Sequence, residues 1–239
     1  MEPEWSATAV LIPALNEEQA LPSVLEALPL GRLHSVVVAD NGSTDGTGEA
    51  ARRLGARVVR EERKGYGSAC LAGIRHLAAL PEPPDVLVFM DADHPEDAER
   101  LPELLLSLRS GADLVLGTRL QEGGETGNVH IHARWGNRFI LGAVRLLWGR
   151  QFQDLAPFRA IRFSQLLALD MDDEDWGWTL QMQIRAIQAG LTIVELLVPH
   201  RPRSVGRSKI SGSLNASVRV GAKMFYTLAR ERLRGGFRR

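Results

Sequence analysis

Hydrophobic and polar positions alternate in blocks along the first half of the chain, where short apolar runs are separated by longer amphipathic segments. Runs rich in valine, isoleucine and leucine predict strands at residues 8–13, 35–40, 56–60, 85–90 and 113–119. Apolar residues three and four positions apart predict helices between these strands, at about 21–28, 45–55, 67–80 and 97–111. Strands that alternate with helices predict a mainly parallel, Rossmann-like sheet with helices on both faces, so we expect an α/β fold.

The second half of the chain has a less regular pattern. Loops or polar segments are expected at 121–130, 154–162 and 199–212. Helices are expected at 137–148, 177–189 and 213–233, and a strand at 191–198. No break in composition marks a second domain, so residues 1–239 are predicted to form a single domain.

Polar residues follow each predicted strand of the first half. In open α/β sheets the ligand crevice lies beyond the carboxyl ends of the strands, so these residues are expected to line one crevice. They are Asn16 and Glu17, then Asp40, Asn41 and Gly42, then Lys64 and Gly65, then Asp91 and Asp93, and finally Arg119.

The tripeptide Asp91-Ala92-Asp93 comes directly after the apolar run at 85–90. Two carboxylates beyond a strand end can converge on one hard cation, Mg²⁺ or Mn²⁺. Such a cation offsets the charge that develops on a leaving diphosphate. The alternative is that Asp93 caps the helix that begins near Pro95, while Asp91 ends the strand.

The segment DNGSTDGT at 40–47 has the residues of a turn followed by a helix cap. Its functional interpretation is that Asp40 faces a nucleobase or ribose in the crevice, and Glu17 could contact a ribose hydroxyl in the same way. The segment RKGYGS at 63–68 predicts a glycine-rich helix start, whose free N–H groups would favour a phosphate, with Lys64 adding a positive charge.

Composition limits the class of protein. With 44% hydrophobic and 24% charged residues, the 239-residue chain is expected to fold, and its single cysteine, Cys70, fits a reducing, cytoplasmic setting. The net charge is zero, but residues 201–239 hold eleven of the 29 basic residues and one of the 29 acids. A basic end on an acidic body suggests a phosphorylated ligand or an anionic membrane, and we expect no nucleic acid partner.

Neither a secretory signal nor a transmembrane helix is predicted, because the amino terminus is acidic and no long uninterrupted apolar run exists. The predicted final helix mixes arginines with apolar residues such as Phe225 and Leu233. It is therefore expected either to lie on an anionic bilayer or to pack on the domain with its basic side in water.

Nine motifs in order resemble one enzyme family. The first five, VLIPALNEE, VVVADNGSTDGT, RKGYGSACLAGI, VLVFMDAD and DLVLGTR, look like the inverting GT-A glycosyltransferases of family 2. The last four resemble the dolichyl- or polyprenyl-phosphate sugar synthase branch of that family, and they are GNRF, DLAPFRAIR, WGWTLQMQIRA and VPHRPRSVGRSKISG. The string QMQIRA lacks the Gln-x-x-Arg-Trp motif of chain-building synthases, which counts against a processive enzyme.

The resemblance implies residue roles and a division of the domain. The half at about 8–120 would bind the nucleotide sugar, the half at about 121–212 would bind the acceptor, and residues 213–239 would form the basic helix and tail. A divalent metal would be held by Asp91 and Asp93. The nucleotide sugar would be bound by Pro13, Ala14, Asn16, Glu17, Asp40, Asn41, Gly42, Lys64, Gly65, Asp91, Ala92 and Asp93.

The remaining implied roles concern phosphates. Gly136-Asn137 would begin a helix whose N–H groups cradle an acceptor phosphate. Arg119 and Arg159 would act in catalysis beside the phosphates, and Arg203, Arg207 and Lys209 would close over them, since arginine binds phosphate oxygens in pairs.

The implied reaction is the transfer of a sugar from a UDP- or GDP-linked donor to a polyprenyl phosphate. An anionic phosphate acceptor needs no strong general base, whereas a hydroxyl acceptor would need a carboxylate, which the acidic run 172–175 could supply. That run could instead be a solvated loop with a helix cap, and Trp178 could stack on a sugar or pack in the core. The alternatives are a glycosyltransferase with a soluble or glycan acceptor, and a nucleotide-binding protein without catalysis.

Overall fold

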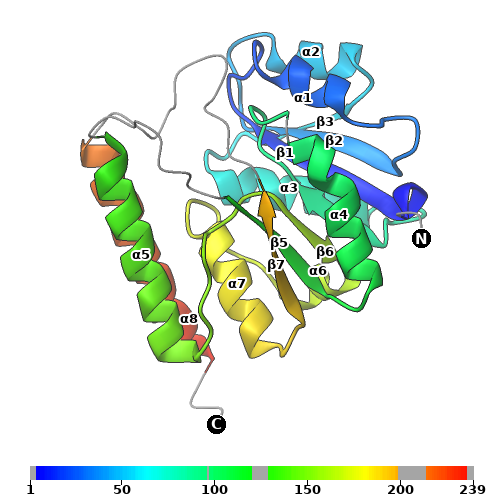
Figure 1. Cartoon of the computed structure of the whole chain (residues 1–239). Helices are drawn as coiled ribbons and strands as arrows, with labels where there is room; N and C mark the ends of the chain where they lie inside the picture. The colour runs from blue at the N-terminus through cyan, green and yellow to red at the C-terminus, as the bar shows by residue number, and fades with distance from the viewer. Residues whose placement is uncertain (1–3, 96, 120–128, 199–213, 236–239) are drawn as a thin grey trace.

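The computed structural model describes residues 4–95, 97–119, 129–198 and 214–235. Its core is a seven-stranded sheet of order β3-β2-β1-β4-β6-β5-β7 (Figure 1). The strands are β1 (Thr8–Ala14), β2 (Ser35–Asp40), β3 (Arg57–Arg60), β4 (Val86–Phe89), β5 (Leu114–Arg119), β6 (Arg159–Arg162) and β7 (Ile193–Val198). The helices are α1 (Leu21–Ala27), α2 (Thr47–Arg53), α3 (Tyr66–Ala78), α4 (Asp97–Arg109), α5 (Val129–Trp148), α6 (Phe163–Ala168), α7 (Trp178–Gln188) and α8 (Leu214–Arg234).

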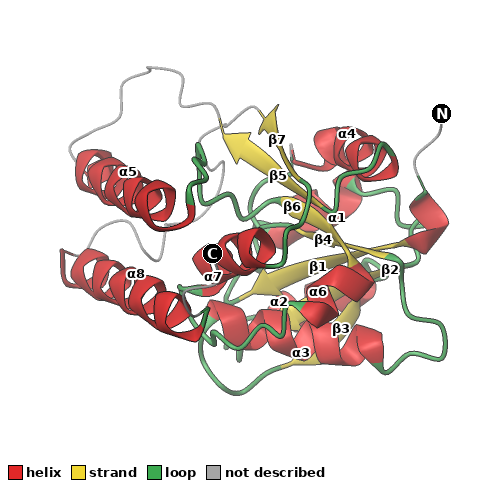
Figure 2. Cartoon of the chain, turned by 90° about the horizontal axis from the view of Figure 1, so that it is seen from below, coloured by secondary structure: helices red, strands yellow, loops and turns green. Residues whose placement is uncertain are grey.

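Alternate residues of the central strand β1 enter two separate cores. Ala9 and Leu11 join a cluster beneath α3, α6 and α7, whereas Val10 and Ile12 join a cluster beneath α1 and α4. This two-sided burial is what a sheet with helices on both faces requires, and Figure 2 shows both layers. The mixed α/β prediction is therefore confirmed.

Strand β6 differs from the sequence prediction. Residues 154–162 were expected to be a polar segment, but Arg159–Arg162 form a strand that runs antiparallel between β4 and β5. Four residues with an arginine at each end are too short and too polar to show a strand pattern, although Ala160 and Ile161 between them are fully buried. The remaining strand pairs are parallel, so the sheet is mainly parallel as predicted.

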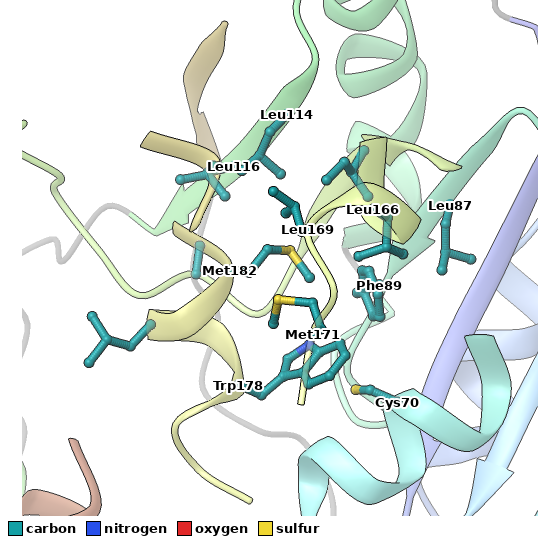
Figure 3. Close-up of a cluster of buried hydrophobic side chains, with 14 of the residues drawn as sticks. Cys70, Leu87, Phe89, Leu114, Leu116, Leu166, Leu169, Met171, Trp178 and Met182 are labelled. Carbon is teal, nitrogen blue, oxygen red and sulfur yellow. The ribbon is translucent and has the colours of Figure 1, made fainter. Parts of the chain in front are cut away.

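Trp178, at the start of α7, is a core residue. It is 1% exposed and its ring lies 6.2 Å from that of Phe89, with Cys70 and Met171 in the same buried cluster (Figure 3). Of the two roles considered for this tryptophan, packing is the one that the structure shows.

Helices α5 and α8 lie side by side next to α7 in both whole-chain views (Figure 1, Figure 2). Helix α5 begins at Val129 rather than near 137. Among the described residues, no helix combines the length and the apolar character that crossing a bilayer requires.

Candidate functional site

The carboxyl ends of β1, β2 and β4 meet at one edge of the sheet. The strand register pairs Ala14 with Asp40 and Leu11 with Phe89. Asp91 follows Phe89 by two residues, so it reaches nearly the same level as Asp40. The polar segments after these strands are thus neighbours, as the sequence predicts.

The acid pair follows the fully buried strand β4. Asp91 and Asp93 are partly exposed, whereas Ala92 between them is 5% exposed. His94 Nδ1 lies 2.9 Å from Asp93 Oδ1, so this histidine orients the second carboxylate. Both carboxylates therefore lie just beyond the end of β4, at the carboxyl edge of the sheet.

The donor set suits a hard divalent cation. Carboxylate oxygens are the ligands that Mg²⁺ and Mn²⁺ prefer. Within the described ranges, no group of three or more His, Cys, Asp and Glu side chains is arranged to hold a metal ion. A metal held by Asp91 and Asp93 would therefore complete its coordination with water and the oxygens of a bound diphosphate, which is the usual arrangement for Mg²⁺.

The loops after β1 and β2 interlock. Asn16 has a left-handed backbone with φ of 50°, a conformation that asparagine tolerates better than most residues. Its N–H donates to Ser43 Oγ at 2.9 Å, and its Oδ1 accepts the Thr44 N–H at 2.8 Å. The next N–H, of Glu17, donates to Thr47 Oγ1 at 2.8 Å. Asn16 and Glu17 are thus held in place by the second loop.

Asp40 ends β2 and is 4% exposed. Its carboxylate accepts the Ser43 N–H at 2.8 Å and lies 3.3 Å from Arg60 Nη1. These contacts show that the turn interpretation of residues 40–47 describes the local structure, with Asp40 closing the loop. Contact between Asp40 and a nucleoside stays a prediction.

Asn41 joins the second loop to the third. Its side-chain amide donates to the Arg63 carbonyl at 2.7 Å and accepts the Gly65 N–H at 2.8 Å. Lys64 Nζ donates to the carbonyl oxygens of Asn41, at 3.1 Å, and Gly42, at 2.9 Å. Lys64 and Gly65 therefore hold the wall of the crevice together.

Two N–H groups at the start of α3 already have partners within the protein, so phosphate binding by this segment stays a prediction. The N–H of Gly65 is bonded to Asn41, and the N–H of Ser68 donates to the Glu174 carbonyl at 2.9 Å. A Cβ on Gly67 would collide with the Asp173 backbone, so glycine is needed there for close approach of the chain. The glycines at 65 and 67 thus allow the backbone of residues 173–174 to lie against the start of α3.

The acidic run 172–175 is not a solvated loop. Asp173 is fully buried, lies 3.0 Å from Lys223 Nζ and accepts the Thr227 hydroxyl at 3.3 Å. Asp172 pairs with Arg185 at 2.9 Å and with Arg234 at 2.5 Å. These two acids join α7 and α8 through ion pairs, so the solvated-loop interpretation is wrong for them.

The pKa of Asp172 reflects these cations. Burial alone would raise the pKa, but hydrogen bonds from Arg234 and Gln181 and the charges of Arg185 and Arg230 outweigh it and lower the pKa to about 2. Asp172 is therefore ionised at neutral pH and is a poor general base.

Arg159 lies inside the core rather than on a surface that could close over a phosphate. It is 1% exposed and follows the register of β6, where it pairs with Phe89 of β4. Its guanidinium donates to the Thr179 carbonyl at 3.2 Å and to the Ala156 carbonyl. Both ends of its guanidinium are thus bonded to backbone carbonyls, and the predicted contact of Arg159 with phosphates stays a prediction.

A buried charge cluster surrounds this arginine. Burial lowers the pKa of Arg159 to about 10, and the neighbouring groups Tyr66, Cys70, Asp154 and Asp91 oppose the shift. Burial also raises the pKa of both Tyr66 and Cys70 well above their ordinary values. Arg159 is thus charged at neutral pH, and Asp91 is among the acids that favour its charged form. Sequence reasoning missed Tyr66 and Cys70 as its neighbours because their positions on α3 carry no local signal for them.

The remaining predicted residues concern the acceptor side. Gly136-Asn137 does not begin a helix, because α5 begins at Val129 and their N–H groups lie within it. The side chains of Arg119 and Asn137 and the whole of Arg203, Arg207 and Lys209 lie outside the described part of the chain. The predicted loops at 121–130 and 199–212 fall there too, apart from residues 129 and 130.

An acid pair at the carboxyl edge of a mixed α/β sheet is the arrangement of a glycosyltransferase with the GT-A fold, and the comparisons with known proteins agree. The family described as glycosyl transferase family 2 matches residues 9–194. The chain belongs to this family, and it is a glycosyltransferase.

Several relatives cover most of the chain. It is 42% identical over 218 residues to an uncharacterized glycosyltransferase of Mycobacterium tuberculosis, covering 89% of this chain and 93% of the relative. It is 34% identical to the undecaprenyl-phosphate mannosyltransferase of Micrococcus luteus, covering 85% and 87%. It is 33% identical to the polyprenol monophosphomannose synthase of Mycolicibacterium smegmatis, covering 86% and 82%.

A solved structure has the same fold. Glucosyl-3-phosphoglycerate synthase from Mycobacterium tuberculosis, crystallised with Mn²⁺, UDP and glucosyl-3-phosphoglycerate, superposes with a TM-score of 0.73 at 26% identity. The match covers 94% of this chain and 79% of that one. The GT-A fold expected from the sequence is thereby confirmed.

Proposed function

We propose that this glycosyltransferase moves a sugar, with inversion, from a nucleoside diphosphate sugar to a polyprenyl phosphate. The observation that carries the proposal is the position of Asp91 and Asp93 beyond buried strand β4, at the edge where the interlocked loops after β1 and β2 also end. The relatives named for undecaprenyl phosphate and polyprenol support the acceptor class.

The donor would lie against the three linked loops. Their hydrogen bonds hold the crevice wall in place before the ligand arrives, which lowers the entropy cost of binding. The residues proposed to line the nucleotide-sugar site are Pro13, Ala14, Asn16, Glu17, Asp40, Asn41, Gly42, Lys64, Gly65, Asp91, Ala92 and Asp93. UDP is the favoured nucleotide, because the solved relative was crystallised with it.

Asp91 and Asp93 would hold Mg²⁺ or Mn²⁺ together with the diphosphate oxygens. When bound, such an ion neutralises the charge of the leaving diphosphate. His94 would keep the Asp93 carboxylate oriented, and Arg159 would place a fixed positive charge behind Asp91. The Mn²⁺ in the solved relative supports the choice of ion.

The reaction is a single displacement. An oxygen of the acceptor phosphate attacks the anomeric carbon as the bond from that carbon to the diphosphate oxygen breaks. Because the phosphate is already anionic, no side chain needs to remove a proton from it. Arg119, Asn137, Arg203, Arg207 and Lys209 are proposed to position the acceptor and the phosphates.

A water-soluble donor and a lipid acceptor meet only at a bilayer surface. We therefore propose that the enzyme works as a peripheral protein on the cytoplasmic face of a membrane. The single buried cysteine, Cys70, fits a reducing compartment.

A second candidate acceptor is a small, soluble phosphate compound. It is favoured by the solved relative, which was also crystallised with phosphoglyceric acid. The two candidates differ in where a labelled sugar goes. Transfer to polyprenyl phosphate moves the label into an organic phase, whereas transfer to a soluble phosphate leaves it in water.

The test combines this phase assay with isosteric substitutions of the acid pair. Asp91→Asn and Asp93→Asn are each expected to lower turnover on polyprenyl phosphate by roughly a hundredfold or more, because the site loses a charged ligand. The matched control is Asp170→Asn, an exposed acid whose backbone φ of 50° asparagine also accepts. If either acid-pair variant keeps the activity and Mn²⁺ response of the control, the proposed site is wrong.

A further inference from the structure

Exposed apolar side chains concentrate on two helices. Of the nine large hydrophobic residues that are exposed within the described chain, six belong to α5 and α8. They are Phe139, Leu146 and Leu147 on α5, and Phe225, Tyr226 and Leu233 on α8. Scattered exposed apolar residues are ordinary, but a concentration of them marks a binding surface.

On α8 the exposed apolar residues repeat with a helical period. Ala222, Phe225, Tyr226, Ala229 and Leu233 are exposed, with Phe225 at 52% and Leu233 at 83%. The opposite side of the same helix is buried against the domain through residues 227, 228 and 231. Helix α8 therefore packs on the domain through a largely polar side, at Thr227, Leu228 and Glu231, while its apolar side is left exposed by the described part of the chain.

Helix α5 extends the same surface. Phe139 is 62% exposed and Leu146 is 85% exposed, two turns apart on the helix. The rings of Phe139 and Phe225 lie 5.5 Å apart, so the exposed faces of the two helices meet at these residues. We call the surface formed by Phe139, Leu146, Phe225, Tyr226 and Leu233 the α5–α8 face.

The charge of these two helices indicates which kind of partner the α5–α8 face binds. Arg138 and Arg145 on α5 and Arg219 on α8 are exposed basic residues, whereas Lys223, Arg230 and Arg234 of α8 pair with Asp172 and Asp173. Glu231 is the one acid in the two helix sequences. Glu231 is 1% exposed and pairs with Arg185 at 2.9 Å, so it adds no negative charge at the surface. A second copy of the chain would bring like charges together, and a nucleic acid would leave Leu146 and Leu233 uncovered.

We propose that the α5–α8 face docks on an anionic bilayer, with its aromatic and leucine side chains in the interface and the arginines near lipid phosphates. Amphipathic helices with this composition bind membranes in this way. The proposal deepens the proposed function, on which it rests for the reason to reach a lipid acceptor.

The chain order connects this face with the crevice. Strand β5 ends at Arg119 and α5 begins at Val129, while β7 ends at Val198 and α8 begins at Leu214. Because β5 and β7 are parallel neighbours, both helices follow strands that end at the same edge of the sheet. Docking through α5 and α8 would bring that strand edge to the bilayer surface.

The test is co-sedimentation of the full chain with vesicles of phosphatidylcholine, with and without phosphatidylglycerol. The double variants Phe139→Ser/Leu146→Ser on α5 and Phe225→Ser/Leu233→Ser on α8 are each expected to lower the partition coefficient about tenfold or more, since each loses two inserted side chains. The control is Leu167→Ser on α6, which is 48% exposed and outside the face. Circular dichroism and Tm must show that all three variants are folded.

Three outcomes overturn the proposal: unchanged binding of both double variants, unchanged binding of the α5 variant alone, or equal binding to vesicles without phosphatidylglycerol. A dimer in sedimentation velocity that these substitutions dissociate also overturns it, because the face would then join two copies. Loss of binding in both double variants but not in the control supports it.

A second measurement separates docking from the chemistry. With polyprenyl phosphate in detergent micelles, the two double variants are expected to keep the wild-type turnover, whereas with acceptor in vesicles they lose it. If wild-type protein binds vesicles through this face but transfers no sugar in detergent, the proposed function fails and docking stands. If transfer occurs in both settings regardless of these substitutions, docking fails alone.

Discussion

The two sides of the candidate site are held together by different kinds of interaction. On the donor side, neutral hydrogen bonds join three loops that follow neighbouring strands, with Asn16 and Asn41 as the connecting side chains. On the proposed acceptor side, ion pairs join Asp172 and Asp173 to α8, across fifty or more residues of sequence. The donor wall is therefore set by local loop chemistry, and the acceptor wall depends on one distant helix being in place.

The two walls also touch. Glu174, next to the buried acid Asp173, accepts the N–H of Ser68 and pairs with Arg63, and Asn41 holds the Arg63 carbonyl. A continuous set of contacts thus runs from α8 to the donor loops. Substitutions at the two ends show whether the walls are stabilised independently.

The largest effect is expected from the buried ion pair. Asp173→Ala leaves the charge of Lys223 without its carboxylate partner. The substitution is expected to lower the free energy of unfolding by about 3 kcal/mol. Urea denaturation measures this loss, with Asp170→Asn as the exposed control. A loss no larger than that of the control would show that α8 does not depend on this pair.

A smaller effect is expected on the donor side. Asn41→Ala removes three hydrogen bonds from a residue that is 5% exposed, so we expect a loss of about 1–2 kcal/mol in the free energy of unfolding. Because the crevice wall loosens, nucleotide affinity by calorimetry should fall as well. Asp173→Ala should change that affinity less, and an equal fall in both variants would mean that the two walls act as one unit.

The smallest effect is a pH dependence. The pKa of Asp172 is lowered to about 2 in the folded protein, below its ordinary value of about 4. Its ion pairs therefore stabilise the fold above about pH 4, and this contribution is lost as the pH falls toward 2. The Tm values of wild type and Asp172→Asn, measured by thermal unfolding, should therefore converge as the pH falls over that range. A constant difference between the two Tm values would assign the acid sensitivity to other groups.

Much of the donor half was predictable because its signals are local. The five strands were found within two residues of their ends, since all but the short edge strand β3 contain an apolar run that is buried on both faces of the sheet. The crevice residues after β1, β2 and β4 followed from the rule that parallel strands end at one edge. The acid pair at 91 and 93 was placed correctly for the same reason.

The acceptor half was predicted less well because its interactions are distant. The acidic run 172–175 looked like an exposed loop, and the partners that bury Asp173 lie on α8. A polar stripe on that helix, at Lys223, Thr227, Arg230 and Arg234, was the available signal, but nothing local says which acids it meets. Strand β6 was missed because four residues carry too little pattern.

By itself, the sequence determined the class of fold and the edge of the sheet at which the acid pair lies, because strand burial and chain order fix these locally. Only the tertiary structure decided that Arg159 is a core cation, that the glycines of residues 65–67 admit a chain segment, and that α5 and α8 share one exposed face. Those features depend on which segments meet in space. Burial and ion pairing depend on contacts between segments that are distant in the sequence, so neither segment alone reveals them.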